Sequence, residues 1–235
     1  MIKKRLIQLR KKFDKFGIDG YVIPKNDEFF SEYSQKDRLK TITNFTGSAG
    51  IAVILRDKNY LFVDGRYTIQ AQLESSKEFK ITNIEKINDC NLFRNLIIGL
   101  DPKLFTSIQI KKIFNRCKKV KEIELNLVDN IYNRYKSHSK PFFSLNENTV
   151  GESHLIKIKK IVNLIKKNNS NYLFISAPEN VAWLLNIRGY DNPNSPIPNC
   201  RLIVSDKKEI FLISEKNKAK NLVKIKKIKK TNVIL

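Results

Sequence analysis

The sequence has few of the residue types that build metal and nucleophile sites. Its 235 residues include two histidines, His138 and His154, and neither has a second histidine at i+3 or i+4 or lies in an HExxH pattern. The three cysteines, Cys90, Cys117 and Cys200, are far apart, odd in number and not in a CxxC pair. We therefore expect no metal site in this chain, and free thiols of a reducing compartment, the cytoplasm, instead of a disulfide framework.

Long apolar runs are also missing. No segment approaches the roughly 18 consecutive apolar residues of a membrane span. The basic start at residues 1–5 is followed by no long apolar stretch with a small-residue cleavage site, so we expect no signal peptide. Hydrophobic residues nevertheless make up 41% of the chain, which is enough for a packed core in one large domain or two ordinary ones.

Common catalytic and phosphate-binding motifs are not found either. Residues 47–50, Gly-Ser-Ala-Gly, come closest to a GxSxG nucleophile elbow, but the spacing is wrong and no histidine in that half of the first domain is available as a base for Ser48. Neither GxxxxGK[ST] nor GxGxxG occurs. We interpret residues 47–50 as a tight turn packed close to a strand, and we expect no catalytic residue in the chain.

The excess of positive charge is the strongest signal in the composition, with a formal net charge of +22. Clustered Lys and Arg would favour nucleic acid or another anionic surface, because they release counterions from phosphates. However, the chain has 35 Lys against 10 Arg, is rich in Ile and Asn as well, and spreads its basic residues along the whole sequence. We favour codon bias and a solvated basic surface, and nucleic-acid binding is kept as an alternative.

Strands and helices alternate along the first 140 residues. A stripe of apolar residues predicts a helix over 2–16, ended by Gly17, and a buried strand follows at 20–24. Two strands joined by a polar turn, 51–55 and 60–63, predict a hairpin. Further helices are predicted at 68–73, 92–98 and 107–117, the last capped by Ser107, and further strands at 79–81, 97–100 and 122–125. The alternation predicts an α/β domain with a mixed sheet flanked by helices.

The same order of elements occurs again after a polar segment at 136–148, which we interpret as a linker. Helix, strand, helix, long loop and hairpin are predicted at 153–167, 172–175, 178–187, 188–199 and 201–213. We therefore predict two domains, residues 1–140 and 150–235. Roughly sixty residues follow the first hairpin and far fewer follow the second, so we expect the second domain to be truncated, with a sheet edge and part of an apolar face lacking a partner.

Two short motifs stand out. Asp-Gly-Arg-Tyr at 64–67 directly follows a predicted buried strand. Asp64 and Arg66 form either a structural ion pair that caps the following helix, or a site where the planar Arg66 guanidinium holds a carboxylate or carbonyl of a ligand. Trp-Leu-Leu-Asn-Ile-Arg-Gly at 183–189 predicts a core helix that ends at glycine, with Trp183, the only Trp of the chain, buried.

Several segments, taken in order, resemble the N-terminal region of the three-domain Xaa-Pro aminopeptidases of the creatinase/prolidase superfamily. They are Ser31-Glu32-Tyr33, Arg38, 45–50, 64–67 with Gln70-Ala71, Asp101-Pro102, Asn126-Leu127-Val128-Asp129, and 183–189 with Pro196. The resemblance covers about residues 1–215. The stretch Glu179-Asn180-Val181-Ala182 departs from the family pattern, which usually has an acidic residue and Ile before its Trp-Leu.

The resemblance implies two creatinase-type α/β domains followed by a C-terminal pita-bread domain. That domain holds two divalent metal ions, Mn or Zn, on two Asp, two Glu and one His, and a metal-bridging water removes the N-terminal residue before proline. Nothing in this sequence matches it, so no metal ligand is carried over and the chain alone is expected to be inactive. The resemblance implies roles in substrate access and in a cytoplasmic homodimer, with Arg66 binding the proline-containing peptide. A freestanding binding or regulatory module of the same fold is an alternative.

Overall fold

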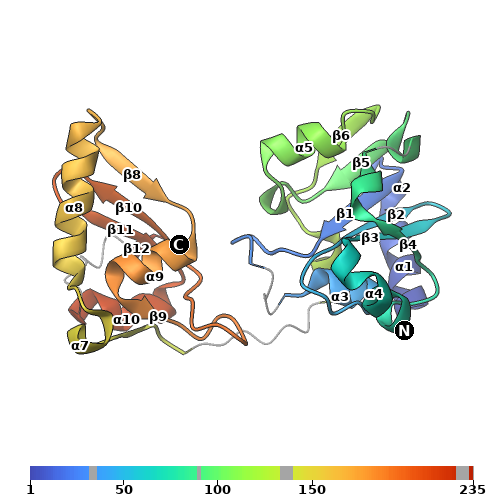
Figure 1. Cartoon of the computed structure of the whole chain (residues 1–235). Helices are drawn as coiled ribbons and strands as arrows, with labels where there is room; N and C mark the ends of the chain where they lie inside the picture. The colour runs from blue at the N-terminus through green and yellow to red at the C-terminus, as the bar shows by residue number, and fades with distance from the viewer. Residues whose placement is uncertain (32–35, 89–90, 133–139, 226–232, 235) are drawn as a thin grey trace. The chain divides into compact units, whose positions relative to one another are not determined.

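The computed structural model describes residues 1–235 except 32–35, 89–90, 133–139, 226–232 and 235. The chain divides into two compact units, unit 1 (Met1–Tyr135) and unit 2 (Lys136–Leu235), and each is described by itself (Figure 1). No helix within the described ranges is long and apolar enough to cross a bilayer.

Unit 1 is built around a six-stranded sheet in the order β4-β3-β2-β1-β5-β6. The strands are β1 Gly20–Pro24, β2 Ile51–Leu55, β3 Asn59–Val63, β4 Lys80–Asn83, β5 Ile97–Leu100 and β6 Lys119–Glu122. β2 pairs antiparallel with both β1 and β3, which gives the predicted hairpin, whereas β4, β5 and β6 join by parallel pairing. The mixed sheet of an α/β domain is therefore confirmed.

Helices cover both faces of this sheet, with α3 and α4 on one side and α5 on the other in Figure 1. The first face carries α1 Ile2–Arg10, α2 Phe13–Phe16, α3 Arg38–Thr43, the 3₁₀ turn η1 Gly65–Tyr67, α4 Thr68–Glu74 and α6 Leu127–Ile131. The second face carries the 3₁₀ turns η2 Ile84–Ile87, η3 Asn91–Phe93 and η4 Pro102–Leu104, with α5 Ser107–Ile113. Each face has its own cluster of buried apolar side chains, one containing Leu9 and Tyr21 and the other Val22 and Phe114.

Several local predictions for unit 1 need correction. The helix expected at 2–16 is broken at Lys11-Lys12, and the left-handed Gly17 (φ 53°) ends the chain of helical turns as predicted. The helix expected at 92–98 is wrong: the segment forms a single 3₁₀ turn and then β5, because its apolar side chains fill the second face of the sheet. The strand expected at 122–125 instead occupies Lys119–Glu122.

The N-cap of α5 is also one residue earlier than predicted. Thr106, not Ser107, accepts a hydrogen bond from the Gln109 backbone N–H, and the Gln109 side chain accepts one from the Thr106 backbone N–H. This reciprocal capping box satisfies two backbone donors that the first turn of a helix leaves unpaired, which explains why the helix begins at Ser107.

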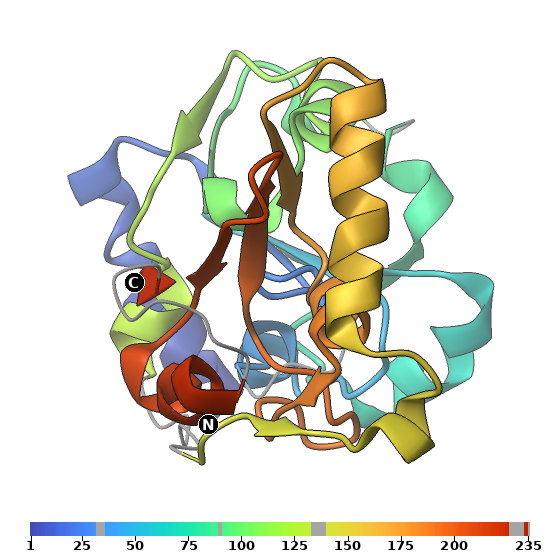
Figure 2. The same ribbon diagram turned by 90° about the vertical axis from the view of Figure 1, so that its left-hand side faces the viewer.

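Unit 2 contains a four-stranded sheet in the order β12-β11-β10-β8 and a small two-stranded sheet. The large sheet is made of β8 Tyr172–Ile175, β10 Arg201–Ser205, β11 Ile210–Ile213 and β12 Val233–Ile234, and the small one of β7 Phe143–Ser144 and β9 Ile187–Arg188. The helices are α7 Glu147–Val150, α8 His154–Lys167, α9 Pro178–Leu185 and α10 Lys216–Ile225. α8, the long gold helix of Figure 2, packs against the sheet through Ile158, Val162 and Ile165.

The start of unit 2 lies inside the segment that the sequence analysis assigned to a linker. Phe142 is fully buried in the apolar core of unit 2, and β7 pairs with β9 directly after it. The polar composition of residues 136–148 hid this contact, because a single buried aromatic and a two-residue strand leave no periodic pattern.

Candidate functional site

The carboxyl ends of three parallel strands in unit 1 bring the predicted motifs to one edge of the sheet. β1 and β5 are parallel, and β3 is parallel to β1 because each is antiparallel to β2. Lys25, Asp64 and Asp101 come directly after these three strands. In open α/β sheets ligands bind outside the carboxyl ends of the strands, near the point where the strand order reverses. Here that point lies between β1 and β5.

Asp64 and Arg66 form the ion pair that the sequence suggested. Arg66 donates from Nε to Asp64 Oδ1 at 3.1 Å and from Nη2 to Asp64 Oδ2 at 2.8 Å, while its backbone N–H donates to Asp64 Oδ1 at 2.9 Å. Asp64 thereby caps η1, and the hydrogen bond from the Arg66 side chain lowers the pKa of the Asp64 carboxyl. The Arg66 side chain is 73% exposed. The structural pair therefore exists, and it presents an oriented guanidinium at the surface.

Tyr67 links this motif to the glycine-rich loop. Its hydroxyl lies 2.7 Å from Ser48 Oγ, and its ring packs edge-on against the buried Phe45. A Cβ on Gly47 would lie 2.1 Å from Phe45 Cζ, so only glycine fits there. The hydroxyl partner of Ser48 is thus a tyrosine and not a base, which supports the interpretation of residues 47–50 as a tightly packed turn.

A hollow of about 260 Å³ opens beside this turn, lined by Lys25, Ser48, Phe105, Gln109 and neighbouring residues. Lys25 is almost fully buried, and its Nζ lies 2.5 Å from Asp37 Oδ2. Asp37 also caps α3 by accepting a hydrogen bond from the Lys40 backbone N–H. Lys25 is therefore held by the protein itself and is a structural cation more than a ligand group.

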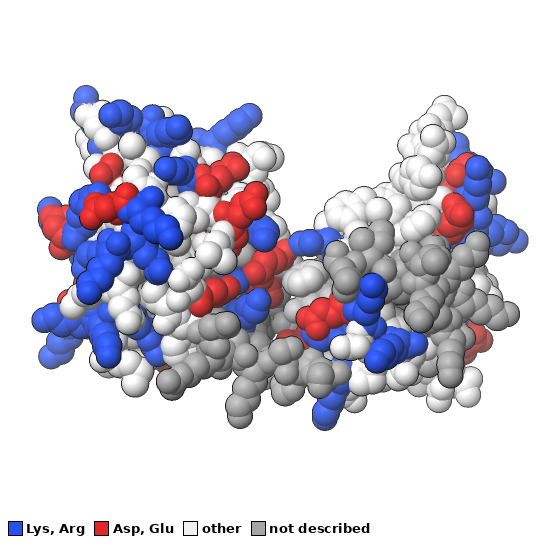
Figure 3. Space-filling view, turned by 180° about the vertical axis from the view of Figure 1, so that it is seen from behind, with Lys and Arg blue, Asp and Glu red and all other residues white. Residues whose placement is uncertain are grey.

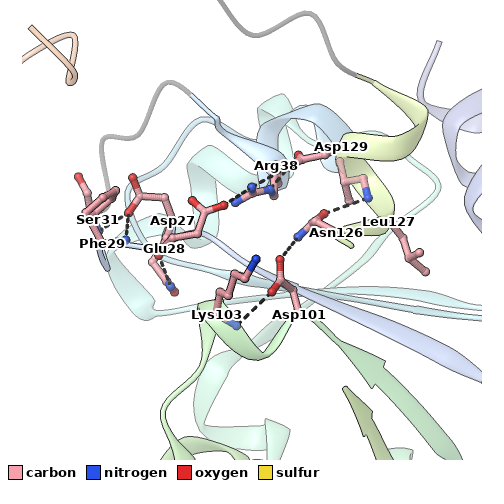
Figure 4. Close-up of polar contacts among 12 residues, drawn as sticks. Asp27, Glu28, Phe29, Ser31, Arg38, Asp101, Lys103, Asn126, Leu127 and Asp129 are labelled. Atoms are coloured by element: carbon pink, nitrogen blue, oxygen red, sulfur yellow. Dashed lines mark hydrogen bonds and ion pairs between the residues drawn. The ribbon is translucent and has the colours of Figure 1, made fainter. Parts of the chain in front are cut away.

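Arg38 lies at the centre of a buried polar network shown in Figure 4. Its side chain is 2% exposed, donates two hydrogen bonds to Asp129 at 2.8 and 2.7 Å, and donates a third to Glu28 Oε1 at 2.6 Å. Burial would raise the pKa of Glu28, but the hydrogen bond and charge of Arg38 outweigh it and lower that pKa. The network ties α3, α6 and the loop after β1 together.

Asn126 extends this network toward β5 (Figure 4). Its Nδ2 donates to Asp101 Oδ2 at 3.0 Å, and its Oδ1 accepts from the Val128 backbone N–H at 3.0 Å, which caps α6. The Tyr21 hydroxyl accepts a hydrogen bond from the Leu127 backbone N–H, and burial raises the pKa of Tyr21. Four of the residues that carried the family resemblance, Arg38, Asp101, Asn126 and Asp129, thus hold the fold together.

Ser31 and Glu28 both lie in the loop after β1, and the sequence analysis marked the first and missed the second. Asp27 Oδ1 accepts hydrogen bonds from the Phe29 and Ser31 backbone N–H groups at 2.9 Å each. Of the Ser31-Glu32-Tyr33 motif, Glu32 and Tyr33 lie outside the described residues. Glu28 was missed because a single acidic residue in a polar stretch gives no signal of a partner ten positions away.

The motif in unit 2 corrects the prediction that Trp183 is buried. Trp183 is 57% exposed, while its neighbours on α9, Ala182 and Leu184, are buried. Underneath it, Lys157 is 3% exposed, with Nζ 4.3 Å from the Trp183 ring centroid and donating to Asn186 Oδ1 at 2.7 Å. Burial lowers the pKa of Lys157. The helix ends at the left-handed Asn186 (φ 54°) and not at Gly189.

The histidines and cysteines occupy separate places. His154 is the first residue of α8, as predicted, whereas His138 and Cys90 lie outside the described residues. Cys117 and Cys200 are free thiols, and burial raises the pKa of Cys117 to about 11. Within the described part of the chain, no three His, Cys, Asp or Glu side chains are placed to hold a metal ion.

Charged side chains are interspersed on the surface. On the face drawn in Figure 3, Lys and Arg cover more of the surface than Asp and Glu, and the acidic groups lie among them. Several of the basic groups are engaged by acidic ones, as in the pair of Arg56 Nη1 and Asp14 Oδ1 at 2.8 Å.

Both units match family models that carry the same description. A family model described as "Creatinase/Prolidase N-terminal domain" matches residues 5–124, and a second model with that description matches residues 133–234. The "Probable Xaa-Pro aminopeptidase P" of Coprinopsis cinerea is 31% identical over 229 residues, which is 91% of this chain and 37% of that protein. "Aminopeptidase P2" of Arabidopsis thaliana is 31% identical over 239 residues, covering 92% of this chain and 33% of that protein.

A solved structure matches both units together. The X-prolyl aminopeptidase from Caenorhabditis elegans, described as "a cytosolic enzyme with a di-nuclear active site", matches 100% of this chain and 42% of that chain, with a TM-score of 0.84 and 25% identity. This chain spans about a third of the length of the curated relatives, and corresponds to their N-terminal third. A family model matches each unit, the fold is shared with a solved relative, and the motif residues lie at the carboxyl ends of the strands of the first sheet. The chain therefore belongs to the creatinase/prolidase N-terminal domain family.

Proposed function

We propose that this chain serves as the N-terminal, non-catalytic region of an Xaa-Pro aminopeptidase, which removes the N-terminal residue preceding proline. The observation that carries the proposal is the similarity of nearly the whole chain to the N-terminal third of such enzymes. We place the metal chemistry of such an enzyme in the polypeptide that follows the matched region. A di-nuclear active site is described for the Caenorhabditis elegans enzyme, and two Mn or Zn ions are the cofactors we expect there.

Arg66 is the residue that we propose contacts the peptide substrate. Asp64 fixes its Nε and Nη2, so the guanidinium is oriented before a ligand arrives and less side-chain entropy is lost on binding. The planar fork suits a peptide carbonyl or carboxylate. Arg66 follows the carboxyl end of β3, the end of the strands beyond which α/β folds bind ligands, although β2 separates β3 from the reversal between β1 and β5.

A homodimer in the cytoplasm is the proposed assembly, with unit 1 supplying subunit contacts. Ile69 and Leu73 lie one turn apart on α4 and are 73% and 81% exposed. An apolar pair on the surface of a helix that follows Arg66 suits a contact with a second subunit. Sedimentation of the chain tests this role: the double substitution Ile69→Glu and Leu73→Glu is expected to shift the species to the monomer, and an unchanged dimer or a monomeric parent chain contradicts it.

The functional test places this chain in front of a catalytic domain. A fusion replaces the matching region of the Caenorhabditis elegans enzyme with this chain, and release of the first residue from an Xaa-Pro-Yaa peptide is measured with Mn²⁺. We expect the fusion to be active and this chain alone to be inactive. Sustained release by the chain alone contradicts the proposal.

The role of Arg66 is tested in the same fusion. Loss of a charged hydrogen bond is worth about 1.5–3 kcal/mol, so Arg66→Ala is expected to lower kcat/KM by about 10- to 100-fold. Arg56→Ala is the matched control. Arg56 is also exposed and paired with an aspartate, but it lies in the β2–β3 turn, at the opposite end of β3 from Arg66. Equal kcat/KM values for the two variants would show that Arg66 does not contact the substrate.

A further inference from the structure

The second face of the unit 1 sheet is covered unevenly. Near β5, the aromatic residues at the ends of η4 and α5, Phe105 and Phe114, are buried together with Leu100. On the same face, β3 and β4 are contacted by η2, a 3₁₀ turn of four residues. A turn this short leaves part of two strands uncovered. A hollow of about 580 Å³ opens there, which we call the β3–β4 hollow.

Four side chains of the β3–β4 hollow form a two-by-two array. β3 and β4 pair in parallel, with Tyr60 opposite Lys80 and Phe62 opposite Thr82. Partners in a parallel pair, and residues two apart on one strand, point to the same face of a sheet. Phe62 lies in the buried cluster of the second face, so all four side chains belong to that face. An aromatic column of β3 therefore stands beside a polar column of β4.

The aromatic column offers an apolar surface to a ligand. The rings of Tyr60 and Phe62 are stacked, with centroids 6.1 Å apart and an interplanar angle of 23°. Phe62 is fully buried, whereas Tyr60 is partly exposed and lines the hollow. A further aromatic ring can pack against Tyr60 in an offset or edge-on arrangement. The hollow therefore favours a ligand with a planar aromatic ring.

The lysines of the hollow determine which charge the ligand carries. Lys80 and Lys86 belong to its described lining, which contains no acidic residue. Lys80 is exposed on the outer strand β4 and lies opposite Tyr60, so its ammonium can reach an acid group on a ring that packs there. The described lining also contains neither Arg nor Gly. Because phosphate sites typically use Arg forks or glycine-rich turns, a carboxylate is the better match.

Thr82 supplies a hydrogen-bonding group that the fold leaves unused. Its Oγ1 is buried and has no hydrogen-bond partner. Buried hydroxyl groups in native proteins are normally paired, because an unpaired one loses the bonds that it makes with water. A rotation about χ1 that turns the hydroxyl toward an acid group in the hollow breaks no existing hydrogen bond. Thr82 can therefore donate to a ligand that Lys80 also holds.

We propose that the β3–β4 hollow binds a small aromatic carboxylate, with its ring against Tyr60 and its acid group between Lys80 Nζ and Thr82 Oγ1. The volume of the hollow lies within the roughly 300–1,000 Å³ that is typical of small-molecule sites, whose walls are mainly apolar with a few polar groups. The proposal is independent of the aminopeptidase role, because Tyr67, next to Arg66, packs in the cluster of the first face.

The test is an NMR titration of the whole 235-residue chain with 2-naphthoate, and with 2-naphthamide as an uncharged probe of the same shape. We expect 2-naphthoate to cause saturating shifts of the backbone amides of β3, β4 and η2, with a dissociation constant of about 1 mM or lower. 2-Naphthamide should bind about 10-fold more weakly, because it lacks the charge that Lys80 neutralises.

Three substitutions assign the contacts. Lys80→Met should weaken the binding of 2-naphthoate about 10-fold, through loss of a charged hydrogen bond. Thr82→Val keeps the shape of the side chain and removes the hydroxyl, and should weaken binding about 3-fold. Lys119→Met is the matched control, because Lys119 is an exposed lysine on β6, the other outer strand of the sheet. It should leave the dissociation constant unchanged.

Three results overturn the inference. The shifts rise without saturation or spread beyond β3, β4 and η2, or 2-naphthamide binds as tightly as 2-naphthoate, which shows apolar adsorption only. Alternatively, Lys80→Met and Lys119→Met weaken binding equally, which shows a general effect of charge. If the amide spectrum of Lys80→Met shows a disturbed fold, the comparison of the two probes on the unsubstituted chain decides.

Discussion

The first strand of each repeat, β1 in unit 1 and β8 in unit 2, sits in a different environment, although the strands beside it are paired in the same way. β1 lies between β2 and β5, with buried apolar clusters on both faces of its sheet. β8 lies at the edge, with one buried cluster on the side of α8 and α9 and exposed aromatic residues on the other. The strands common to the two repeats are therefore paired alike, whereas β1 has a further partner in β5 that β8 lacks among the described residues.

The two units also place their buried charges differently. Unit 1 uses the Arg38 network, whose members come from α3, α6 and the loop after β1. Unit 2 uses an ion pair between Lys218 on α10 and Asp191 in the long loop, both nearly fully buried. In each unit the charged pair joins segments distant in sequence, so its removal should destabilise one unit and leave the other unchanged.

The largest expected effect is in unit 1. Arg38→Met removes a buried cation and leaves Glu28 and Asp129 without their partner. We expect the free energy of unfolding of unit 1 to fall by about 3–5 kcal/mol. Native-state hydrogen exchange of β1 and β2 measures this loss. Fluorescence of Trp183, the only Trp, reports unit 2 and should keep its denaturation midpoint. The control Arg56→Ala should leave the stability of both units unchanged. If Arg38→Met destabilises unit 2 as much as unit 1, the units do not unfold separately.

A somewhat smaller loss is expected in unit 2. Lys218→Met leaves Asp191 without its cation, but Asp191 Oδ2 still accepts a hydrogen bond from the Asn199 backbone N–H at 2.9 Å. We expect a destabilisation of about 3 kcal/mol, seen as a lower midpoint of Trp183 fluorescence with unchanged exchange in β1. Lys220→Met, at an exposed position of the same helix, serves as the control. A midpoint equal to that of the control would show that the pair contributes nothing.

Two glycines of unit 1 provide the next comparison. Gly47→Ala drives a methyl group into the buried Phe45 ring, and overpacking of this kind costs about 1–3 kcal/mol. Gly65→Ala meets nothing within 4 Å, so it should be neutral or stabilise by at most about 1 kcal/mol. Chemical denaturation of both variants measures the difference. If Gly65→Ala proves the more harmful, the glycine-rich turn is not packed as described.

The smallest effects should appear on opposite sides of neutral pH. The pKa of Glu28 is lowered in the folded state, so its contribution to unit 1 is present above the unfolded value of about 4.3 and is lost as the pH falls through the folded pKa. Burial would lower the pKa of Lys218, but Asp191 raises it, so its contribution to unit 2 is present below about pH 10.4 and is lost at higher pH.

The pH comparison is measured by following each unit across a titration. Glu28→Gln should reduce the acid sensitivity of unit 1 alone, and Lys218→Met should reduce the alkaline sensitivity of unit 2 alone. Two results would contradict this account. Either a substitution changes the pH dependence of the other unit, or neither substitution changes the pH dependence of its own unit.

Much of the fold follows from local patterns. The hairpins of β2 with β3 and of β10 with β11 were predicted because alternating apolar residues flank a polar turn. Residues 92–98 and Trp183 were misjudged because an apolar run or a large aromatic residue says nothing about which neighbour it meets. The first fills the second face of a sheet, and the second lies on the outward side of α9, above Lys157.

The candidate site divides in the same way. Asp64 and Arg66 are two positions apart, so their pairing could be proposed from the sequence. Arg38 and Asp129 are 91 positions apart, and only the resemblance to a family marked both without saying that they touch. Arg38 is buried and structural, whereas Arg66 is exposed. Neither the spacing of the residues nor the composition predicts that difference in burial.

The most direct test of the contrast between the units is hydrogen exchange of β1 and β8 in the chain alone at low concentration. In β1, we expect all backbone amides that pair with β2 or β5 to be protected. In β8, we expect only the amides that pair with β10 to be protected, with the others exchanging at rates near those of an unstructured peptide. Protection of every amide of β8, independent of concentration, would contradict an open edge in unit 2.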